Sequence, residues 1–435
     1  MLADRVLLGT QLRKMRKEQK KRQEDFADEM ISIATISLIE RGLPNVKEEK
    51  VEYYADKLGF RLEEAPNLAE EERKKERLFL FHLYAMYDQV DLGEAAEGFT
   101  KLKKMDIHDT NPYYPVYLYL MARCKIMQRE FPPAQRILSE AILCIDKYPL
   151  VVKMNTKSLC YYDLSKTFFY NNDFRNALSY AEEGIKAFQT NGEKKYLLYS
   201  LLISKSLYLN RLHRSEEALN IIDDLWENID SIKNIFVLLN MYESKSSILQ
   251  TQQRYEEAII ITKEGLELAR YNLFNDRSFD LWVLLGRIYL CKKSLEEAEI
   301  CFLTAISLKK RVDKDYLFMN LHTQLGRLYI MSKRWNEAKK ALTEAISYKE
   351  KTYDNEHIIS SFYYMGYLFR EIGEMSMAMK YFQQAQQLAK EHDYQEYQHK
   401  IHLEMAKCLK SLDQKQFINC LVDLFEIELE LVSKL

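Results

Sequence analysis

Hydrophobic residues recur at intervals of three and four positions along most of the chain, with polar residues between them. This spacing places the apolar side chains on one face of an α-helix, so the pattern predicts a chain of amphipathic helices. A longer period is superimposed on it, because one set of apolar and small residues returns every 40 positions. The clearest copy consists of Trp282, Leu285, Gly286, Tyr289, Ala298, Phe302 and Ala305. The next two copies consist of Leu325, Gly326, Tyr329, Ala338, Leu342 and Ala345, then of Phe362, Gly366, Phe369, Ala378, Phe382 and Ala385.

Weaker copies extend this period towards both ends of the chain. They centre on Ala258, Ala218, Ala177, Ala134 and Ala95, and a last helix pair surrounds Ala406. The spacing W-x2-L-G-x2-Y followed by A-x3-F-x2-A resembles the tetratricopeptide repeat, whose usual length is about 34 residues; the longer period predicts longer helices. The small residue at each Gly position lets the two helices of a pair approach closely. We therefore expect residues 77–435 to form a right-handed tetratricopeptide-like α-solenoid of about eight to nine helix pairs.

A separate unit precedes the repeats, at residues 1–62. Its pattern predicts four helices, which cover residues 8–17, open at Gln23, follow Ser32 and cover residues 46–58. Ser32 is expected to cap the third helix, and Gly42 is expected to end it. Residues 63–76 are charge-rich and contain Pro66, so we expect them to be a linker.

The composition supports an all-α fold. Gly (12 copies) and Pro (7 copies) are scarce among the 435 residues, and both disfavour helix interiors. The seven Cys residues form no Cys-x-x-Cys pair, which favours reduced thiols and a cytoplasmic location. No signal peptide is readable and no run of about 18 apolar residues occurs, so we expect no association with a membrane.

The net charge of −2 says nothing about partners, but the distribution of charge is informative. Between Arg13 and Arg22, seven basic residues accompany a single acid, Glu18. Such a run is usually a solvated helix face. At the start of a helix-turn-helix unit it is also typical of a surface that contacts DNA phosphates.

The first unit resembles the Cro/repressor-type (XRE) helix-turn-helix family. The matching residues are Leu8, Gly9, Arg16, Gln23, Ala27, Ile36, Ser37, the run Ile39-Glu40-Arg41-Gly42 and the ending Asp56-Lys57-Leu58-Gly59. The resemblance implies a partly buried ion pair between Arg16 and Glu40. It also implies that Gln23 contacts the DNA backbone, where the N-terminus of the second helix favours phosphate.

The predicted DNA-contact residues combine the basic run with the recognition positions of the family. They are Arg13, Lys14, Lys17, Gln23, Ala34, Thr35, Ser37 and Leu38. The base-reading positions of the family fall on Ile33, Ala34 and Leu38, whose side chains have no hydrogen-bonding groups and can touch only thymine methyl groups. Phosphate contacts and DNA shape are therefore expected to dominate over base readout. A helix-turn-helix that has lost DNA binding stays open as an alternative.

The two units together resemble the RRNPP class of peptide-responsive quorum-sensing regulators (the Rgg, Rap, NprR, PlcR and PrgX type), and the NprR-like branch most closely. The resemblance implies a transcriptional regulator that binds double-stranded DNA, forms a homodimer and binds a short signalling peptide in the concave face of its repeats. It leaves a second function open, because some members bind a response regulator of the sporulation phosphorelay. Rap members promote dephosphorylation of such a partner.

The first helix of each pair, helix A, lines the concave face of a tetratricopeptide solenoid, so its polar residues are candidate peptide contacts. They are Lys166, Asn210, Asn240, Gln250, Asp280, Arg287, Asn320, Arg327 and Tyr367. Amide side chains both donate and accept, so they can hold a peptide backbone of any sequence, and arginines suit a carboxylate. The groove would span about five to ten extended residues. The alternative is a solvated groove without a ligand.

The sequence carries no signature of catalysis or of a bound cofactor. No Walker loop, G-x-S-x-G, H-E-x-x-H or kinase motif is present, so we expect neither an enzyme nor a cofactor. His399 and His402 lack a third ligand at a matching spacing and are interpreted as a surface pair, not as a metal site. The apolar segment 417–432 predicts either packing back onto the solenoid or a dimer contact.

Overall fold

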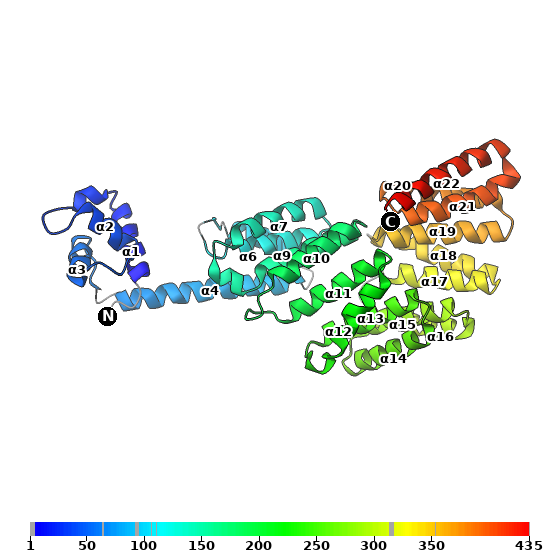
Figure 1. Ribbon diagram of the computed structural model, residues 1–435, viewed down its shortest axis with the longest axis horizontal. Helices are drawn as coiled ribbons and strands as arrows, with labels where there is room; N and C mark the ends of the chain where they lie inside the picture. The colour runs from blue at the N-terminus through cyan, green and yellow to red at the C-terminus, as the bar shows by residue number, and fades with distance from the viewer. Residues whose placement is uncertain are drawn as a thin grey trace. The chain divides into compact units, whose positions relative to one another are not determined.

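The computed structural model describes residues 5–62, 65–91, 95–105, 107–109, 111–312, 317–352 and 354–434, and every regular element within these ranges is a helix (Figure 1). The predicted all-α fold is therefore confirmed. Contacts divide the chain into two compact units, Met1–Glu94 and Ala95–Leu435.

The first unit contains a small helical domain and one long helix. Its elements are α1 (Arg5–Glu18), the 3-10 helix η1 (Gln23–Phe26), α2 (Ile33–Glu40), α3 (Glu48–Lys57) and α4 (Ala65–Asp91). Leu12, Ile36 and Tyr54 lie at the centre of the core, fully shielded from solvent. Helices α1, α2 and α3 each bury one apolar face against the others, so the small domain has a hydrophobic core of its own.

The second predicted helix is only a single 3-10 turn, so the expectation of a helix that opens at Gln23 is wrong in extent. Asp28 gives the physical reason. Its Oδ1 accepts hydrogen bonds from the backbone N–H groups of Met30 (2.8 Å) and Ile31 (3.0 Å). This local turn competes with helix continuation and directs the chain into α2.

The predicted limits of α2 are confirmed. The Ser32 hydroxyl accepts a hydrogen bond from the Thr35 N–H at 3.2 Å, and Gly42 has a φ of +69°. A Cβ atom on Gly42 would lie 2.4 Å from the Cα of Val6, and one on Gly9 would lie 2.2 Å from the Ile39 carbonyl oxygen. Both glycines therefore permit close contact between α1 and the end of α2.

Helix α4 covers most of the segment that the sequence analysis assigned to a linker. Residues 63 and 64 lie outside the described residues, and the chain is helical from Ala65 onward. The domain limits at residues 62 and 77 stay predictions. No helix in the described part of the chain is long and apolar enough to cross a membrane.

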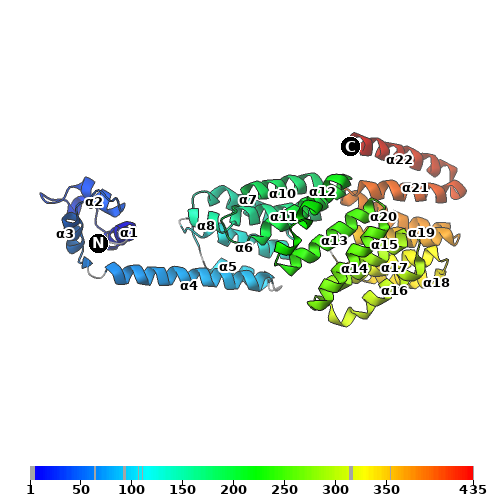
Figure 2. The same cartoon turned by 60° about the horizontal axis from the view of Figure 1, so that its bottom comes forward.

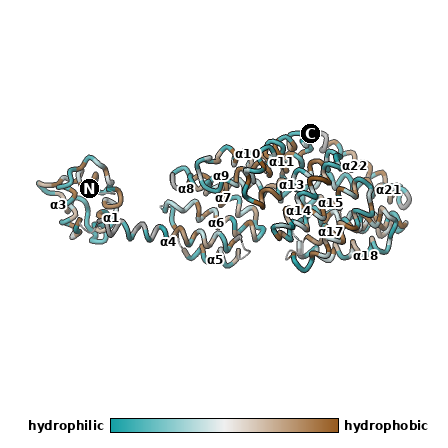
Figure 3. Tube along the Cα trace, turned by 90° about the horizontal axis from the view of Figure 1, so that it is seen from below, coloured by the Kyte–Doolittle hydropathy of each residue, from teal (hydrophilic) through white to brown (hydrophobic). Residues whose placement is uncertain are grey.

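The second unit is a succession of antiparallel helix pairs. Its helices are α5 (Ala95–Lys104), α6 (Tyr114–Met127), α7 (Phe131–Ile145), α8 (Pro149–Lys153), α9 (Thr156–Tyr170), α10 (Phe174–Ala187), α11 (Tyr196–Arg211), α12 (Ser215–Trp226), α13 (Ile235–Thr251), α14 (Tyr255–Tyr271), α15 (Asn275–Cys291), α16 (Leu295–Ser307), α17 (Leu317–Met331), α18 (Trp335–Ser347), α19 (Asn355–Glu371), α20 (Met375–Glu391), α21 (Gln395–Leu412) and α22 (Gln414–Lys434). The pairs are α6–α7, α9–α10, α11–α12, α13–α14, α15–α16, α17–α18, α19–α20 and α21–α22. Figure 3 shows hydrophobic and hydrophilic stretches alternating along these helices.

In the three pairs whose sequences match the repeat most closely, a glycine permits helix A and helix B to approach each other, as the sequence predicts. A Cβ atom on Gly286 would lie 2.4 Å from the Phe302 ring. The equivalent distances are 2.5 Å from Gly326 to Leu342 and 2.7 Å from Gly366 to Phe382. Each glycine lies on helix A and each large side chain on helix B, so the large residue fills the space that the missing side chain leaves.

A residue with positive φ follows helix A in successive pairs. These residues are His213, Gln253, Lys293, Lys333 and Gly373, with φ between 57° and 86°. The residue after each one donates to a carbonyl near the end of helix A, as in the 2.9 Å bond from Ser294 N–H to Tyr289 O. This left-handed cap ends each helix A at the same place, so it preserves the 40-residue period.

The extra length of the repeat has two sources. Helices α13, α14, α15, α19 and α20 each have 17 residues, which agrees with the predicted lengthening. In addition, a short 3-10 turn follows helix B in three pairs: η3 (Ile229–Ser231), η4 (Lys309–Arg311) and η5 (Lys349–Lys351). The sequence pattern does not predict these turns.

The terminal helix α22 packs back onto α21 through buried Cys420 and half-buried Phe417. Its other side exposes Ile418, Leu421, Val422, Phe425 and Leu429. Packing onto the solenoid thus accounts for one face of the apolar segment, and a dimer contact on the other face stays a prediction.

Candidate functional site

The first part of the candidate site is organised by a buried carboxylate, Glu40, at the end of α2. Arg16 Nε lies 2.6 Å from Glu40 Oε1, and Arg16 Nη2 lies 3.0 Å from Oε2. Both residues are buried, with exposures of 9% and 6%. The ion pair implied by the family resemblance is confirmed. Tyr54 from α3 also donates its hydroxyl to Glu40 Oε1 at 2.7 Å.

Burial alone would raise the pKa of Glu40. Hydrogen bonds from Arg16, Tyr54 and Gln23 outweigh this effect and lower the pKa below its usual value. Glu40 is therefore ionised at neutral pH, and the paired guanidinium compensates its charge.

Gln23 has a role within the domain that the sequence pattern does not predict. Its amide nitrogen donates to Glu40 Oε2 at 2.7 Å, so the side chain joins η1 to the buried ion pair. Only contacts across the folded domain reveal this partner, because residues 23 and 40 lie on different elements. The expected contact between Gln23 and the DNA backbone stays a prediction.

The basic run lies on the surface around the end of α1, apart from Arg16. Arg13, Lys14 and Lys17 are exposed on α1, and Lys20, Lys21 and Arg22 are exposed in the following turn. The ordered domain thus presents a concentrated positive surface, which favours polyanions at low and moderate salt.

The exposed face of α2 is mainly apolar. Ile33 and Leu38 are 45% and 38% exposed, and Ala34 is also exposed. Thr35 and Ser37 are half-buried, and the Thr35 hydroxyl lies 2.9 Å from that of Ser32. The predicted DNA-contact residues therefore form two kinds of surface, basic on α1 and apolar on α2.

The second part of the candidate site lies along the helices A of the second unit. Helices α11, α13, α15, α17 and α19 contact one another in succession, and Figure 2 shows α13, α15 and α17 side by side. All nine predicted peptide-contact residues are half-buried on these helices or on α9. The intermediate exposure fits polar groups in a groove.

The predicted residues divide into two levels along the helices. We call the first the arginine level. There, Arg287 Nη2 lies 3.4 Å from Gln250 Oε1, and Arg327 lies over the Tyr364 ring at 5.9 Å from its centroid. Asp280 precedes Arg287 by seven residues, which corresponds to about 10 Å along the helix. Asn240, Asp280 and Asn320 therefore form a second level.

Several predicted residues already have polar neighbours. Asp280 pairs with Arg277 at 3.6 Å, and the Asn320 oxygen accepts a hydrogen bond from Gln324 at 3.2 Å. Lys166 lies 3.9 Å from Asp163. It is on α9 and is therefore separated along the solenoid from Arg287 and Arg327. In Asn210, by contrast, the side-chain oxygen is buried without a hydrogen-bond partner among the described residues.

Positive charge accumulates at the arginine level. Burial lowers the pKa of the Arg287 guanidinium, and the nearby charge of Arg211 lowers it further, while Glu356 opposes this effect. Glu356 itself is paired with Arg211 at 3.3 Å. Among the described residues, no carboxylate forms an ion pair with Arg287. An anionic ligand would therefore be favoured here.

Comparisons with known proteins support the two-part architecture. A helix-turn-helix domain model matches residues 7–68, and a tetratricopeptide repeat model matches residues 279–311 and 359–392. No curated protein sequence matches the chain. A Rap protein complexed with competence and sporulation factor superimposes with a TM-score of 0.59 at 13% identity, over 81% of this chain and 98% of that chain.

Two quorum-sensor structures are also similar. The apo form of NprR from B. thuringiensis has a TM-score of 0.57 at 14% identity, over 86% of this chain and 99% of that chain. NprR in complex with its cognate peptide NprX has a TM-score of 0.52 at 14% identity, over 78% and 87%. The chain is thus similar in fold to these quorum-sensor structures. At these identities the structural likeness is one of fold.

Two parts of the second unit that are distant in sequence also meet. Besides Arg211 and Glu356, His213 Nε2 lies 2.8 Å from Glu396 Oε1, and the Asn172 amide donates to the Asp393 carbonyl at 3.1 Å. We call these three contacts the seam. None of these contacts can be predicted from the sequence, because nothing in a local pattern relates residues that are separated by 145 to 221 positions.

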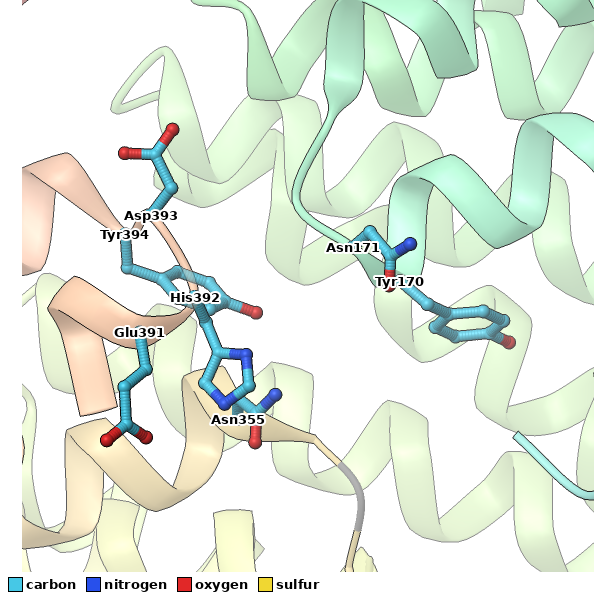
Figure 4. Close-up of a pocket in the computed structure, with 7 residues that line it drawn as sticks. All are labelled: Tyr170, Asn171, Asn355, Glu391, His392, Asp393 and Tyr394. Atoms are coloured by element: carbon cyan, nitrogen blue, oxygen red, sulfur yellow. The ribbon is translucent and has the colours of Figure 1, made fainter. Parts of the chain in front are cut away.

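A cavity of about 310 Å³ adjoins the seam. It is lined by Tyr170, Asn171, Asn355, Glu391, His392, Asp393 and Tyr394. Figure 4 shows Tyr170 and Asn171 on one side and His392 and Tyr394 on the other. None of the predicted peptide contacts lines it, so this cavity is separate from the arginine level.

One minor interpretation from the sequence is wrong. His402 is buried, with an exposure of 4%, and its Nδ1 lies 3.0 Å from the Gln398 carbonyl oxygen. It is therefore not part of a surface pair, because α22 covers this face of α21. His399 lies 2.8 Å from Glu428 of α22. The described residues contain no cluster of His, Cys, Asp or Glu that could hold a metal ion.

Proposed function

We propose that the chain is a DNA-binding transcriptional regulator whose activity is controlled by a short signalling peptide bound along the helices A. The observation that carries the proposal is Arg287, a half-buried guanidinium with Arg211 nearby and an amide, Gln250, as its hydrogen-bonding neighbour. A peptide carboxylate would supply the missing negative charge, and bidentate pairing would fix its orientation. The comparison with NprR bound to its peptide supports this choice of ligand.

The proposed site extends from this charge along the groove. Arg327 contributes a second guanidinium on α17, next to α15. Asn210 offers a buried acceptor oxygen on α11, and Asn240 and Asn320 extend the site to the other level. Such amides would bind the peptide backbone, while the arginines would recognise its carboxyl end.

A pool of peptides of about five to ten residues, with either a free carboxylate or a carboxamide at the C-terminus, tests this proposal. Calorimetry should show that the best binder loses affinity as the carboxamide, and that R287Q and R327Q lose the preference for the carboxylate. Asn240→Ala and Asn320→Ala should weaken binding while the far-UV spectrum stays helical. The control R136Q alters an exposed arginine on a helix B. Unchanged binding in all four groove variants would contradict the site.

The DNA-binding half of the proposal rests on the exposed residues Arg13, Lys14 and Lys17. Replacing all three with Gln should weaken binding to specific and random duplexes alike, and should reduce the slope of log affinity against log salt by about one unit per lost phosphate contact. A triple replacement of exposed Lys103, Lys104 and Lys340 in the second unit is the control. Mobility shifts in a salt series measure both. If the α1 variant kept full affinity, the assignment of phosphate contacts to these three residues would be wrong.

A further inference from the structure

We propose that the carboxylate of Glu356 is an internal competitor of the peptide. In the free chain it pairs with Arg211, and the C-terminal carboxylate of the bound peptide takes its place. This inference rests on the proposed peptide binding and deepens it. It adds Arg211 to the groups that bind the peptide, and it makes Glu356 a residue that limits the affinity.

The pair joins two helices A that are not neighbours. Arg211 is the last residue of α11 and Glu356 lies in the first turn of α19, while α13, α15 and α17 come between these helices in the succession. Arg211 Nη1 lies 3.3 Å from Glu356 Oε1, and Nη2 lies 3.3 Å from Oε2. Two guanidinium nitrogens thus face two carboxylate oxygens, which is the arrangement that a peptide carboxylate would also adopt.

Arg211 lies next to the arginine level. Its neighbour Asn210 donates from the side-chain amide to Thr251 Oγ1 of α13 at 3.4 Å. The residue before Thr251 is Gln250, whose Oε1 lies 3.4 Å from Arg287 Nη2 of α15. These contacts connect the end of α11 to the end of α13 and then to α15. A ligand carboxylate at Arg287 is therefore close to Arg211.

Glu356 acts on both guanidinium groups. Burial and the charge of Arg211 lower the pKa of the Arg287 guanidinium, and the charge of Glu356 opposes this effect. Asp354, a nearby carboxylate, is paired with His357 at 2.7 Å. Glu356 therefore already supplies part of the negative charge that a ligand would bring. A second carboxylate beside it would be repelled, so the two compete for the same arginines.

The pair is loose enough to exchange partners. Its distances of 3.3 Å exceed the about 2.7–2.9 Å of a tight charge-assisted hydrogen bond. The side chains of Arg211 and Glu356 are 41% and 29% exposed, so water can solvate the released carboxylate. The first turn of α19 also favours a negative charge through the helix dipole. The other two contacts of the seam do not involve Glu356, so its release leaves them in place.

The test uses the full chain and the best binder of the peptide pool, with a free carboxylate or a carboxamide at its C-terminus. In calorimetry, E356Q should bind the carboxylate peptide about fivefold more tightly than wild type, the upper value for a partly exposed ion pair. It should bind the carboxamide peptide with unchanged affinity, which also shows that its groove is intact. R211Q should bind the carboxylate peptide more weakly and the carboxamide peptide equally, and it tests the pair independently of how E356Q folds.

The matched control is E243Q, which removes the same charge from another helix A. Glu243 of α13 pairs with Arg277 at 3.1 Å, so its loss should leave the carboxylate preference unchanged. If E356Q gains no affinity, or E243Q gains as much, internal competition is overturned and the proposed site stands. If wild type binds no peptide, or binds the carboxamide as well as the carboxylate, the proposed carboxylate site fails and this inference fails with it.

Discussion

The carboxylate of Glu40 shows how much of the small domain depends on one residue. It accepts hydrogen bonds from Arg16, Gln23 and Tyr54, and so joins α1, η1, α2 and α3. In the low-dielectric interior a fully satisfied group of this kind stabilises one arrangement, while a partly satisfied one is costly. Helix α1, which carries the exposed basic residues, is therefore coupled to this buried group through Arg16.

We predict that Glu40→Ala destabilises the helix-turn-helix domain by about 3 kcal/mol, because Arg16 would remain buried without its counter-charge. Amide exchange should become faster throughout α1, α2 and α3 and stay unchanged in α11 to α20, since repeat stability is local. Glu52→Ala, an exposed position of α3, is the matched control. Similar exchange in both variants would show that the pair contributes little.

The turn that closes each helix A illustrates how an element is specified. Positive φ at Gln253, Lys293 and Lys333 is set by the cap geometry and not by the residue type, because only Gly373 is a glycine. The small residue within helix A is a stronger requirement. It allows helix B to approach, and in the pair α15–α16 the approaching group is the Phe302 ring.

At this scale we predict that Gly286→Ala destabilises the protein by about 1–3 kcal/mol, the usual cost of overpacking. The added Cβ would lie 2.4 Å from the Phe302 ring, so α15 and α16 would have to separate. Adding Phe302→Leu should restore part of the loss. Ser246→Ala is the control, because Ser246 occupies the same repeat position and its buried hydroxyl has no partner among the described residues. Thermal unfolding that is equally affected by both changes would argue against the close packing.

At the scale of the whole second unit, the seam brings the start of α19 close to the end of α11. The adjacent pair of His357 and Asp354 caps α19, with His357 Nδ1 2.7 Å from Asp354 Oδ2. Burial alone would lower the pKa of His357, but the charge and hydrogen bond of Asp354 raise it above its usual value. Burial alone would raise the pKa of Asp354, but His357 lowers it to about 2.

This pair predicts a pH dependence. Asp354 is ionised throughout the neutral range, so the protonation of His357 decides whether the ion pair exists. Because the folded pKa of His357 is raised, the pair stabilises the protein below the ordinary histidine pKa of about 6.5 and ceases to do so as pH rises through the raised value. The thermal midpoint of wild type should therefore exceed that of His357→Gln by more at pH about 5.5 than at pH about 9. His392→Gln, at an exposed position, is the control; a pH-independent difference would refute the assignment.

Much of this molecule follows from local rules that the sequence states directly. The 40-residue recurrence of Gly286, Gly326 and Gly366 predicts the helix pairs and their close approach, because periodicity and side-chain size act within one pair. Ser32 and Gly42 predict the limits of α2 for the same reason. The pair of Arg16 and Glu40 was accessible only through the family resemblance, since the two residues lie on different helices.

Only the tertiary structure decided the rest. The short η1, the bond from Gln23 to Glu40 and the burial of His402 depend on which element packs against which, and sequence periodicity does not encode that. The meeting of Arg211 with Glu356 depends on small rotations that accumulate over successive repeats. Each rotation is too small to be read from the sequence of one repeat, yet their sum brings together residues 145 positions apart. This meeting places the charges of Arg211 and Glu356 near Arg287.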